Sequence, residues 1–224
     1  MYEMSGIIYS FCLFFSLFLI YSFMGWLIEI LSALINCHKF INRGFLVGPI
    51  IPIWGVGAIL ITLFVKSSDS SFSLIVSSAF IGTFLEYVVN YAMEKIFKAR
   101  WWDYSNLPFN IEGRVWLGSS LLFGFGGFLL IQYFNPFFEN VLLSIDRTFL
   151  CTVSFLLLVL MITDVCVSGH IIKNLKLSAY SLRKDYTEEV TKKVKAALKE
   201  KSYSFRRILK AFPDVNFSFM SNKK

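Results

Sequence analysis

Residues 149–170 read FLCTVSFLLLVLMITDVCVSGH, and Asp164 is the one Asp, Glu, Lys or Arg among them. A helix can cross the hydrocarbon core of a bilayer when about 20 consecutive residues are mainly apolar. This stretch is long enough, and four more runs of the chain are similarly apolar. Together they predict five membrane spans, at 7–35, 46–65, 72–93, 115–135 and 149–170.

The composition places the whole chain in the membrane class. Hydrophobic residues make up 56% of the 224 residues, and the mean hydropathy is +0.61. No alternating pattern of short strands occurs, so we predict an all-α membrane helix bundle of about five spans rather than a β-barrel. The first apolar run follows a flank without Lys or Arg and is too long for a signal peptide, so we expect it to remain as an anchor.

Lys and Arg residues are distributed unevenly between the predicted loops. They follow the first, third and fifth spans, whereas the opposite side has only Lys66 and Arg147. The positive-inside rule then predicts a multi-pass protein of the cytoplasmic membrane, with its N-terminus outside and its C-terminus in the cytoplasm. We therefore divide the chain into a transmembrane bundle, residues 1–172, and a basic cytoplasmic tail, residues 173–224.

The tail accounts for the basic character of the chain. It holds 14 Lys and Arg residues against five acids, and the whole chain has a net charge of +7. It contains no nucleic-acid-binding module, so nucleic acid is not an expected partner. A basic segment beside a membrane attracts anionic membrane lipids or an acidic protein. Residues 185–201 predict an amphipathic helix that suits docking on a partner, a second copy or the membrane surface.

Three acidic residues lie at matching positions in three of the predicted spans. Glu29, Glu86 and Asp164 each precede the next lysine by nine or ten residues, which puts all three about 13–15 Å from the first cytoplasmic lysine and at one level in the inner half of the membrane. Such carboxylates must face protein, water or a cation. Either they pair with arginines from the cytoplasmic loops, or they line a polar cavity for a substrate or ion. No metal or cofactor site is predicted, because His38 and His170 lack paired-ligand spacing.

The second predicted span is interrupted. Its stretch NRGFLVGPIIPIWGVGA, residues 42–58, contains Pro52 and several glycines, so a regular helix through 44–52 is not expected. Broken helices form binding sites in transporters. The alternative is an ordinary turn that leads into a helix begun by proline.

The loop at 98–114, KARWWDYSNLPFNIEGR, is unusually rich in aromatic and charged residues. We interpret it as a lid-like cap on the inner mouth of the bundle, and an aromatic belt with flanking positive charges is the alternative. No catalytic residue is predicted. The candidate polar cluster, which either binds substrate or holds the bundle together, comprises Glu29, Asn42, Arg43, Glu86, Asn90, Arg100, Trp101, Trp102, Asp103, Tyr104, Asn110, Glu112, Arg114 and Asp164.

Several strings resemble one known family. They are YSFMGWLIEI (21–30), NRGFLVGPIIPIWGVGA (42–58), EYVVNYAMEKIF (86–97), RWWDYSNLPFNIEGRV (100–115) and RRILKAFPD (206–214). Through them the chain resembles the bacterial membrane proteins called "putative ABC-transporter type IV", the CmpB-like ABC transporter permeases. The resemblance implies a transport-related membrane subunit and gives no substrate.

Three functions follow from these patterns. The first is a permease-like transport subunit, for which a separate ATPase subunit is needed because the chain has no GxxxxGK[ST] stretch, and for which a homo-oligomer is one arrangement. The second is a non-catalytic sensor or assembly factor that acts through the tail. The third is a membrane enzyme for a lipid-like substrate, although no recognised catalytic motif occurs.

Overall fold

The computed structural model describes residues 2–38, 40–42, 44–67, 69–97, 100–181 and 203–211. The helices are α1 (Tyr2–Cys37), α2 (Pro52–Phe64), α3 (Ser71–Phe97), α4 (Leu117–Leu129), α5 (Asn135–Leu143), α6 (Arg147–Ser181) and α8 (Tyr203–Ala211). A short π-helix, Leu130–Phe134, joins α4 to α5, and a hairpin of β1 (Asn110–Ile111) and β2 (Val115–Trp116) precedes α4. The predicted all-α fold is confirmed. The tail helix expected at 185–201 lies outside the described residues.

Four helices are long and apolar enough to cross a membrane, as expected of a multi-pass membrane protein. They are Gly6–Ile35, Ser71–Phe97, Leu117–Leu143 and Arg147–Asn174. The second predicted span differs from the expectation, because its helix begins only at Pro52 and has 13 residues. That helix is about 20 Å long, whereas the hydrocarbon core is about 30 Å thick.

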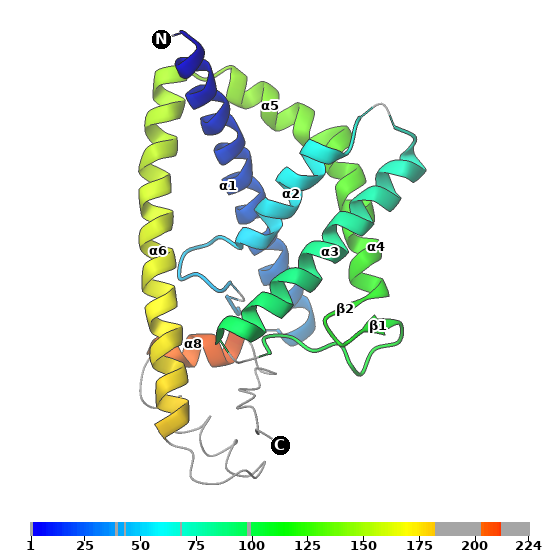
Figure 1. Ribbon diagram of the computed structural model, residues 1–224, viewed down its shortest axis with the longest axis vertical. Helices are drawn as coiled ribbons and strands as arrows, with labels where there is room; N and C mark the ends of the chain where they lie inside the picture. Colours follow the sequence, from blue (N-terminus) through cyan, green and yellow to red (C-terminus); the bar gives the residue numbers. More distant parts are fainter. Residues whose placement is uncertain are drawn as a thin grey trace.

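The long helices alternate in direction (Figure 1). Helices α1, α3 and α6 run from the upper to the lower end of the view, and α2 and the α4–α5 pair return to the upper end. The hairpin and α8 lie at the lower end. Helix α6 stands at the side of the bundle, and only 11% of its most apolar 18-residue window is buried, so most of it faces lipid.

Helices α1 and α2 cross closely because small residues meet bulky ones. A Cβ added at Gly55 would lie 2.5 Å from the carbonyl oxygen of Phe18, and one added at Gly25 would collide with Trp54. Polar side chains strengthen the same region: the Tyr21 hydroxyl donates to Asn135, whose side-chain amide hydrogen-bonds Thr62 at 2.9 Å. These contacts join α1, α2 and α5 around the main core.

Residues 44–51 form a non-helical stretch that we call the re-entrant segment. It returns from the lower end of α1 toward the middle of the molecule, where the Ile51 N–H donates to the carbonyl of Ser22 at 3.0 Å. Ser22 precedes the end of α1 by 15 residues, or about 22 Å of helix. The prediction that a regular helix does not run through 44–52 is therefore confirmed. The first N–H group of a helix has no acceptor within the helix, so proline, which lacks an N–H, fits the first position. This explains why α2 starts at Pro52.

Candidate functional site

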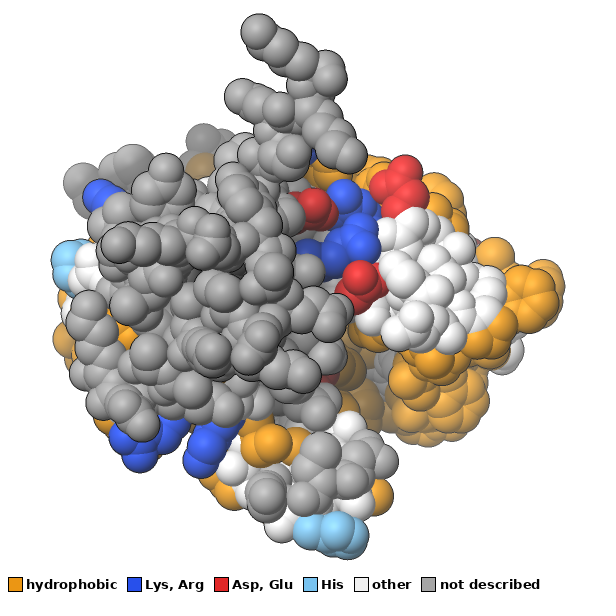
Figure 2. All heavy atoms as spheres, turned by 90° about the horizontal axis from the view of Figure 1, so that it is seen from below, with side chains coloured by type: hydrophobic (Ala, Val, Ile, Leu, Met, Phe, Trp, Pro, Cys, Tyr) orange, Lys and Arg blue, Asp and Glu red, His pale blue; other side chains and the backbone are white. Residues whose placement is uncertain are grey.

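One face of α3 forms the floor of the polar region at the lower end of the bundle. Its buried residues recur every four positions, so they share one helix face, and this face ends in Glu86 and Asn90. Seen from below, Lys and Arg side chains lie beside Asp and Glu side chains on the described part of the surface (Figure 2). Residues of this face of α3 contact residues of the loop 100–116. We call this group, which is centred on Glu86, Asn90 and Arg114, the hairpin cluster.

Glu86 is the most buried acid of the hairpin cluster, with 6% of its surface exposed. Its carboxylate accepts hydrogen bonds from the hydroxyls of Ser119, at 2.9 Å, and Tyr104, at 3.2 Å. Both donors are neutral. Glu29, the second of the three acids, belongs to α1.

Arg114 is the central cation of the hairpin cluster and is 8% exposed. Its guanidinium donates to the Asn90 side-chain oxygen at 2.8 Å and forms ion pairs with Glu94, at 2.7 Å, and Glu112, at 3.2 Å. Burial by itself lowers the pKa of Arg114, but the two carboxylates outweigh it and the pKa is raised. Arg114 therefore stays charged and ties the hairpin to α3.

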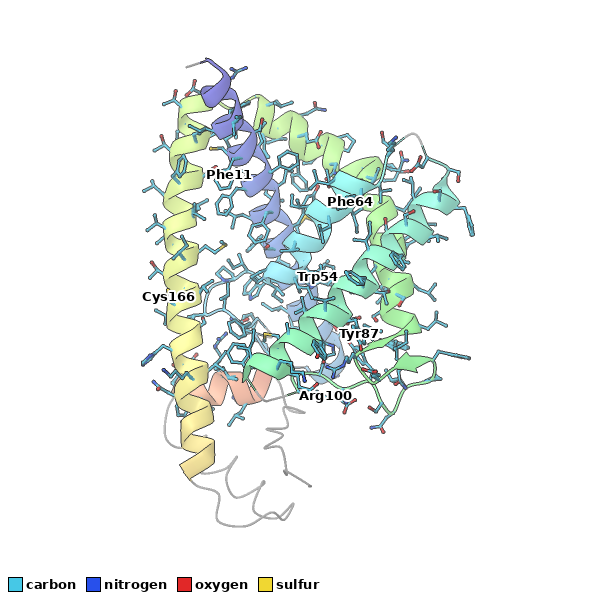
Figure 3. The ribbon with its side chains drawn as sticks, viewed as in Figure 1. Phe11, Trp54, Phe64, Tyr87, Arg100 and Cys166 are labelled. Carbon is cyan, nitrogen blue, oxygen red and sulfur yellow. The ribbon has the colours of Figure 1, made fainter. Side chains whose placement is uncertain are left out.

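The aromatic rings of Tyr87 and Tyr91 also contact Arg114. The guanidinium carbon lies 5.7 Å and 5.3 Å from the centres of the two rings, within the range of a cation–π contact. The Tyr87 hydroxyl also donates to Glu112 at 2.8 Å. Hydrogen bonds from Tyr87 and then Arg114 lower the pKa of Glu112. Figure 3 shows Tyr87 and Arg100 close to the lower end of α3.

Arg100 and Asp103 shape the loop that leads to the hairpin. Arg100 pairs with Asp103 at 3.1 Å and donates to the carbonyl of Glu112 at 2.8 Å. Burial raises the pKa of Asp103, but hydrogen bonds from Ser105 and Arg100 outweigh it and the pKa is lowered. Gly113 has φ +67°, and a Cβ there would collide with Asp103 and Ser105, so the turn requires glycine.

Asn110 fixes the hairpin from inside. Its side-chain amide donates to the Leu107 carbonyl at 2.7 Å, and its side-chain oxygen accepts the Gly113 N–H at 2.9 Å. An Asn that bonds nearby backbone groups in this way stabilises a turn. Asn110 is thus a structural residue of the loop.

Trp101 and Trp102 attach the loop to different helices. Trp102 is joined to α3, and Trp101 packs against α6 and α8. Trp102 donates its indole N–H to the carbonyl of Arg114 at 3.1 Å, and its own carbonyl accepts from Asn90 at 3.2 Å. Trp101 is 3% exposed and packs in a cluster with Ile172 of α6 and Phe205 of α8. The sequence places both side chains at the membrane interface, and the structure shows Trp101 enclosed by protein.

Asp164 belongs to a second group, which we call the segment cluster and which comprises Val47, Gly48, Asp164 and Ser168. Its carboxylate accepts the N–H groups of Val47, at 2.9 Å, and Gly48, at 2.8 Å, and Ser168 donates to it at 3.0 Å. A Cβ at Gly48 would lie 2.8 Å from the Asp164 carboxylate, so this approach depends on glycine. The structure therefore separates Asp164 from Glu86, whose partners are Ser119 and Tyr104.

Asn42 stands at the entrance of the re-entrant segment. Its side-chain oxygen accepts from the Trp26 indole at 3.0 Å and from the Gly44 N–H at 2.9 Å. Arg43, the remaining candidate, lies outside the described residues. Sequence reasoning missed Arg207 of α8, which donates to the carbonyl of Leu46 at 2.8 Å. The signal that could have found it is a basic residue next to the apolar side chains of RRILKAF.

These side chains can hold a charge or orient a polar group. Among the residues that the structure describes, no three His, Cys, Asp or Glu side chains are grouped as metal ligands. An apolar cavity of about 240 Å³ lies between α1 and α2 and is lined by Phe11, Phe15 and Val56 among others. Phe11 lies toward the upper end, whereas Tyr87 and Arg100 lie near the lower end, so this cavity is separate from the hairpin cluster (Figure 3).

Comparison with known proteins gives one match. The family profile described as "Putative ABC-transporter type IV" matches residues 16–169. No curated protein and no solved structure matches the chain. The matched range contains the re-entrant segment, the hairpin cluster and Asp164, and it is more than half of the chain. The protein is therefore a member of the family called Putative ABC-transporter type IV.

Proposed function

We propose that the chain is the permease-like membrane subunit of a transporter and that Glu86 binds the cationic group of its substrate, or a proton, near the cytoplasmic face. The observation that carries this proposal is the environment of Glu86. A 6% exposed carboxylate within a membrane helix, hydrogen-bonded by two neutral hydroxyls, is costly to keep ionised without a cation.

Arg114 is not the cation that pairs with Glu86, because its guanidinium contacts Asn90, Glu94 and Glu112.

The proposed topology puts the lower end of the bundle in the cytoplasm. Lys95, Arg100, Arg114 and Lys210 belong to elements of that end, whereas Lys66 and Arg147 follow or precede helices at the upper end. Cytoplasmic loops of membrane proteins carry an excess of Lys and Arg. In this orientation, the cytoplasmic opening of the substrate path lies beneath the loop 100–116, and this loop covers the opening.

Transport by this chain requires further polypeptides. It has no P-loop motif, so energy from ATP must come from a separate ATPase subunit, docked at the lower end. Four long membrane helices are few for a complete path, so we also propose that two copies or a hetero-complex enclose it.

Ligand-induced stabilisation tests the cation site. The probes are choline and tetraethylammonium, with acetate and benzoate as anions, and the readout is the thermal unfolding midpoint of the purified chain in mild detergent. We expect a cation to raise the midpoint of the wild type and to lose this effect in Glu86→Gln. The matched control is Glu112→Gln, whose side chain is 61% exposed and should leave the effect intact. Stabilisation by anions alone, or equal stabilisation of both variants, refutes the cation site.

Co-purification tests the transport role separately. The tagged full chain, extracted from its native membrane in mild detergent, should retain a P-loop polypeptide whose ATPase rate changes when the chain is present. Repeated isolation without such a polypeptide contradicts the ABC-type permease proposal.

A membrane sensor is the second candidate function. The observation that favours it is the docking of α8 on Trp101 and Ile172, which joins the tail to the bundle. Deletion of residues 203–211 that removes the cellular response and leaves cation binding intact would support the sensor over the permease.

A further inference from the structure

Helix α8 packs on the lower end of the bundle through one apolar face. Phe205, Ile208 and Leu209 are 8%, 2% and 4% exposed, and they contact Trp101 and Ile172. The opposite face carries Lys210, which is exposed, and Tyr203, which is 80% exposed. Figure 1 shows α8 lying across the lower part of α6.

Arg207 connects this helix to the re-entrant segment. One guanidinium nitrogen donates to the carbonyl of Leu46 at 2.8 Å and to that of Gly44 at 3.4 Å, and another donates to the carbonyl of Phe45 at 3.3 Å. Three consecutive carbonyls thus share one guanidinium. Because these residues are not helical, their backbone groups need such external partners at this depth.

Asp164 holds the other polar groups of the same segment. It accepts the N–H groups of Val47 and Gly48, the two residues that follow the three carbonyls. The carboxylate of Asp164 therefore binds N–H groups of the segment, and the guanidinium of Arg207 binds its carbonyl groups. Burial lowers the pKa of Arg207, and the charge of Asp164 offsets part of that change.

Docking of α8 and the hold on the re-entrant segment are coupled. When α8 leaves the bundle, the carbonyls of Gly44, Phe45 and Leu46 lose their common donor, Arg207, together.

We propose that α8 is a latch and Arg207 its positioning residue, so that docking of the tail helix holds the re-entrant segment against Asp164 and undocking releases it. The latch does not rest on the proposed transport function, because it concerns the segment's conformation and needs no substrate. The proposal also gives a role to Arg207, which lies beyond residue 169, where the family match ends.

Amide hydrogen exchange of the full-length chain in mild detergent tests the latch. In Arg207→Ala we expect the amides of Val47 and Gly48 to exchange at least about tenfold faster than in the wild type, because local opening sets the exchange rate. The matched control is Lys210→Ala, which removes one positive charge from the same helix at an exposed position. In the control we expect less than a twofold change.

Chemical rescue separates a positioning role from general loosening. Methylguanidinium, added at millimolar concentration, should restore the protection of Val47 and Gly48 in Arg207→Ala, whereas methylammonium should not, because it lacks the planar fork of donors. Leu209→Ala, which keeps Arg207 but weakens the apolar face, should accelerate exchange in α8 and in the segment by the same factor.

Three outcomes overturn the latch. The first is that Val47 and Gly48 stay protected while α8 exchanges freely. The second is an equal effect of Arg207→Ala and Lys210→Ala. The third is a segment that opens only together with α3 in both Arg207→Ala and Leu209→Ala, which would make the contact part of the global fold. Loss of the cation effect on thermal stability in any variant bears only on the proposed function.

Discussion

Replacement of Arg114 by alanine tests whether the hairpin cluster stabilises the bundle. The guanidinium is 8% exposed and contacts Asn90, Glu94 and Glu112. Asn90 is 2% exposed, so its side-chain oxygen has no access to water that could replace the lost donor. The substitution therefore leaves a buried acceptor without its donor, and it leaves the partly buried carboxylate of Glu94 with only the Arg100 guanidinium at 3.9 Å.

The expected loss follows from these contacts. Removing one member of a buried ion pair costs about 3–5 kcal/mol, and leaving a buried acceptor unsatisfied costs about 1–3 kcal/mol. The side chain of Glu94 is 28% exposed, so solvent screens part of its charge and we take the lower end of the first range. With the lower end of both ranges, we expect Arg114→Ala to lower the free energy of unfolding by about 4 kcal/mol.

Arg100→Ala is the matched control in the same loop. Its side chain is 24% exposed and its nearest carboxylate, on Asp103, is 39% exposed. Pairs of this kind contribute about 0–1 kcal/mol. Arg114→Lys should fall between the two variants, since the ammonium keeps the charge and loses the fork that reaches Asn90 and both carboxylates.

Denaturant unfolding in mixed micelles, followed by tryptophan fluorescence, measures these changes. A double-mutant cycle with Asn90→Ala should give a coupling of about 1–2 kcal/mol, because the two side chains are in direct contact. A loss in Arg114→Ala no larger than that in Arg100→Ala, or the absence of coupling to Asn90, would refute the assignment of Arg114 as the cluster's structural centre.

Two further substitutions test the helix contacts. Gly55→Ala should lower the free energy of unfolding by about 1–3 kcal/mol, because its Cβ would lie 2.5 Å from a backbone carbonyl of α1. Gly126→Ala, which meets nothing within 4 Å, should be neutral or stabilising in the same assay, and equal losses would contradict the close crossing. Helices α1 and α6 meet at Cys12, whose carbonyl accepts a hydrogen bond from Ser154 at 3.5 Å, and Cys151 lies about one turn before Ser154, so copper-phenanthroline should cross-link α1 to α6 through Cys12 and Cys151 and not through Cys166. A Cys12→Ser variant that still forms the intramolecular cross-link, seen as altered gel mobility before reduction, would contradict that pairing.

Four of the five spans could be predicted because hydrophobic length alone determines them. The run at 149–170 has one charged residue and no other structure satisfies its backbone in lipid, so it forms a helix. Pro52 likewise predicts where α2 begins, since proline is tolerated at the first turn and not inside a helix.

The partners of the polar residues could not be predicted in the same way. The sequence gives depth along a helix axis but not the direction of each face, so Glu29, Glu86 and Asp164 are expected together. The structure instead turns Asp164 toward the N–H groups of Val47 and Gly48. Backbone donors have no signature in a sequence, because every residue except proline carries one.

Arg207 was missed for a related reason. It lies in a basic stretch where each Lys or Arg is expected to face water or lipid head groups. Its role depends on three carbonyls that lie 161–163 positions away in the chain, and only the folded molecule brings them together.

The shortness of α2 affects how the chain crosses a bilayer. Its 13 residues cover about 20 Å of a hydrocarbon core about 30 Å thick, which leaves about 10 Å to the preceding non-helical residues. Extended chain covers about 3.3 Å per residue, so about three residues would span that distance. Residues 44–51 are longer than the distance requires, and this extra length lets the chain bend sideways to reach Asp164 on α6.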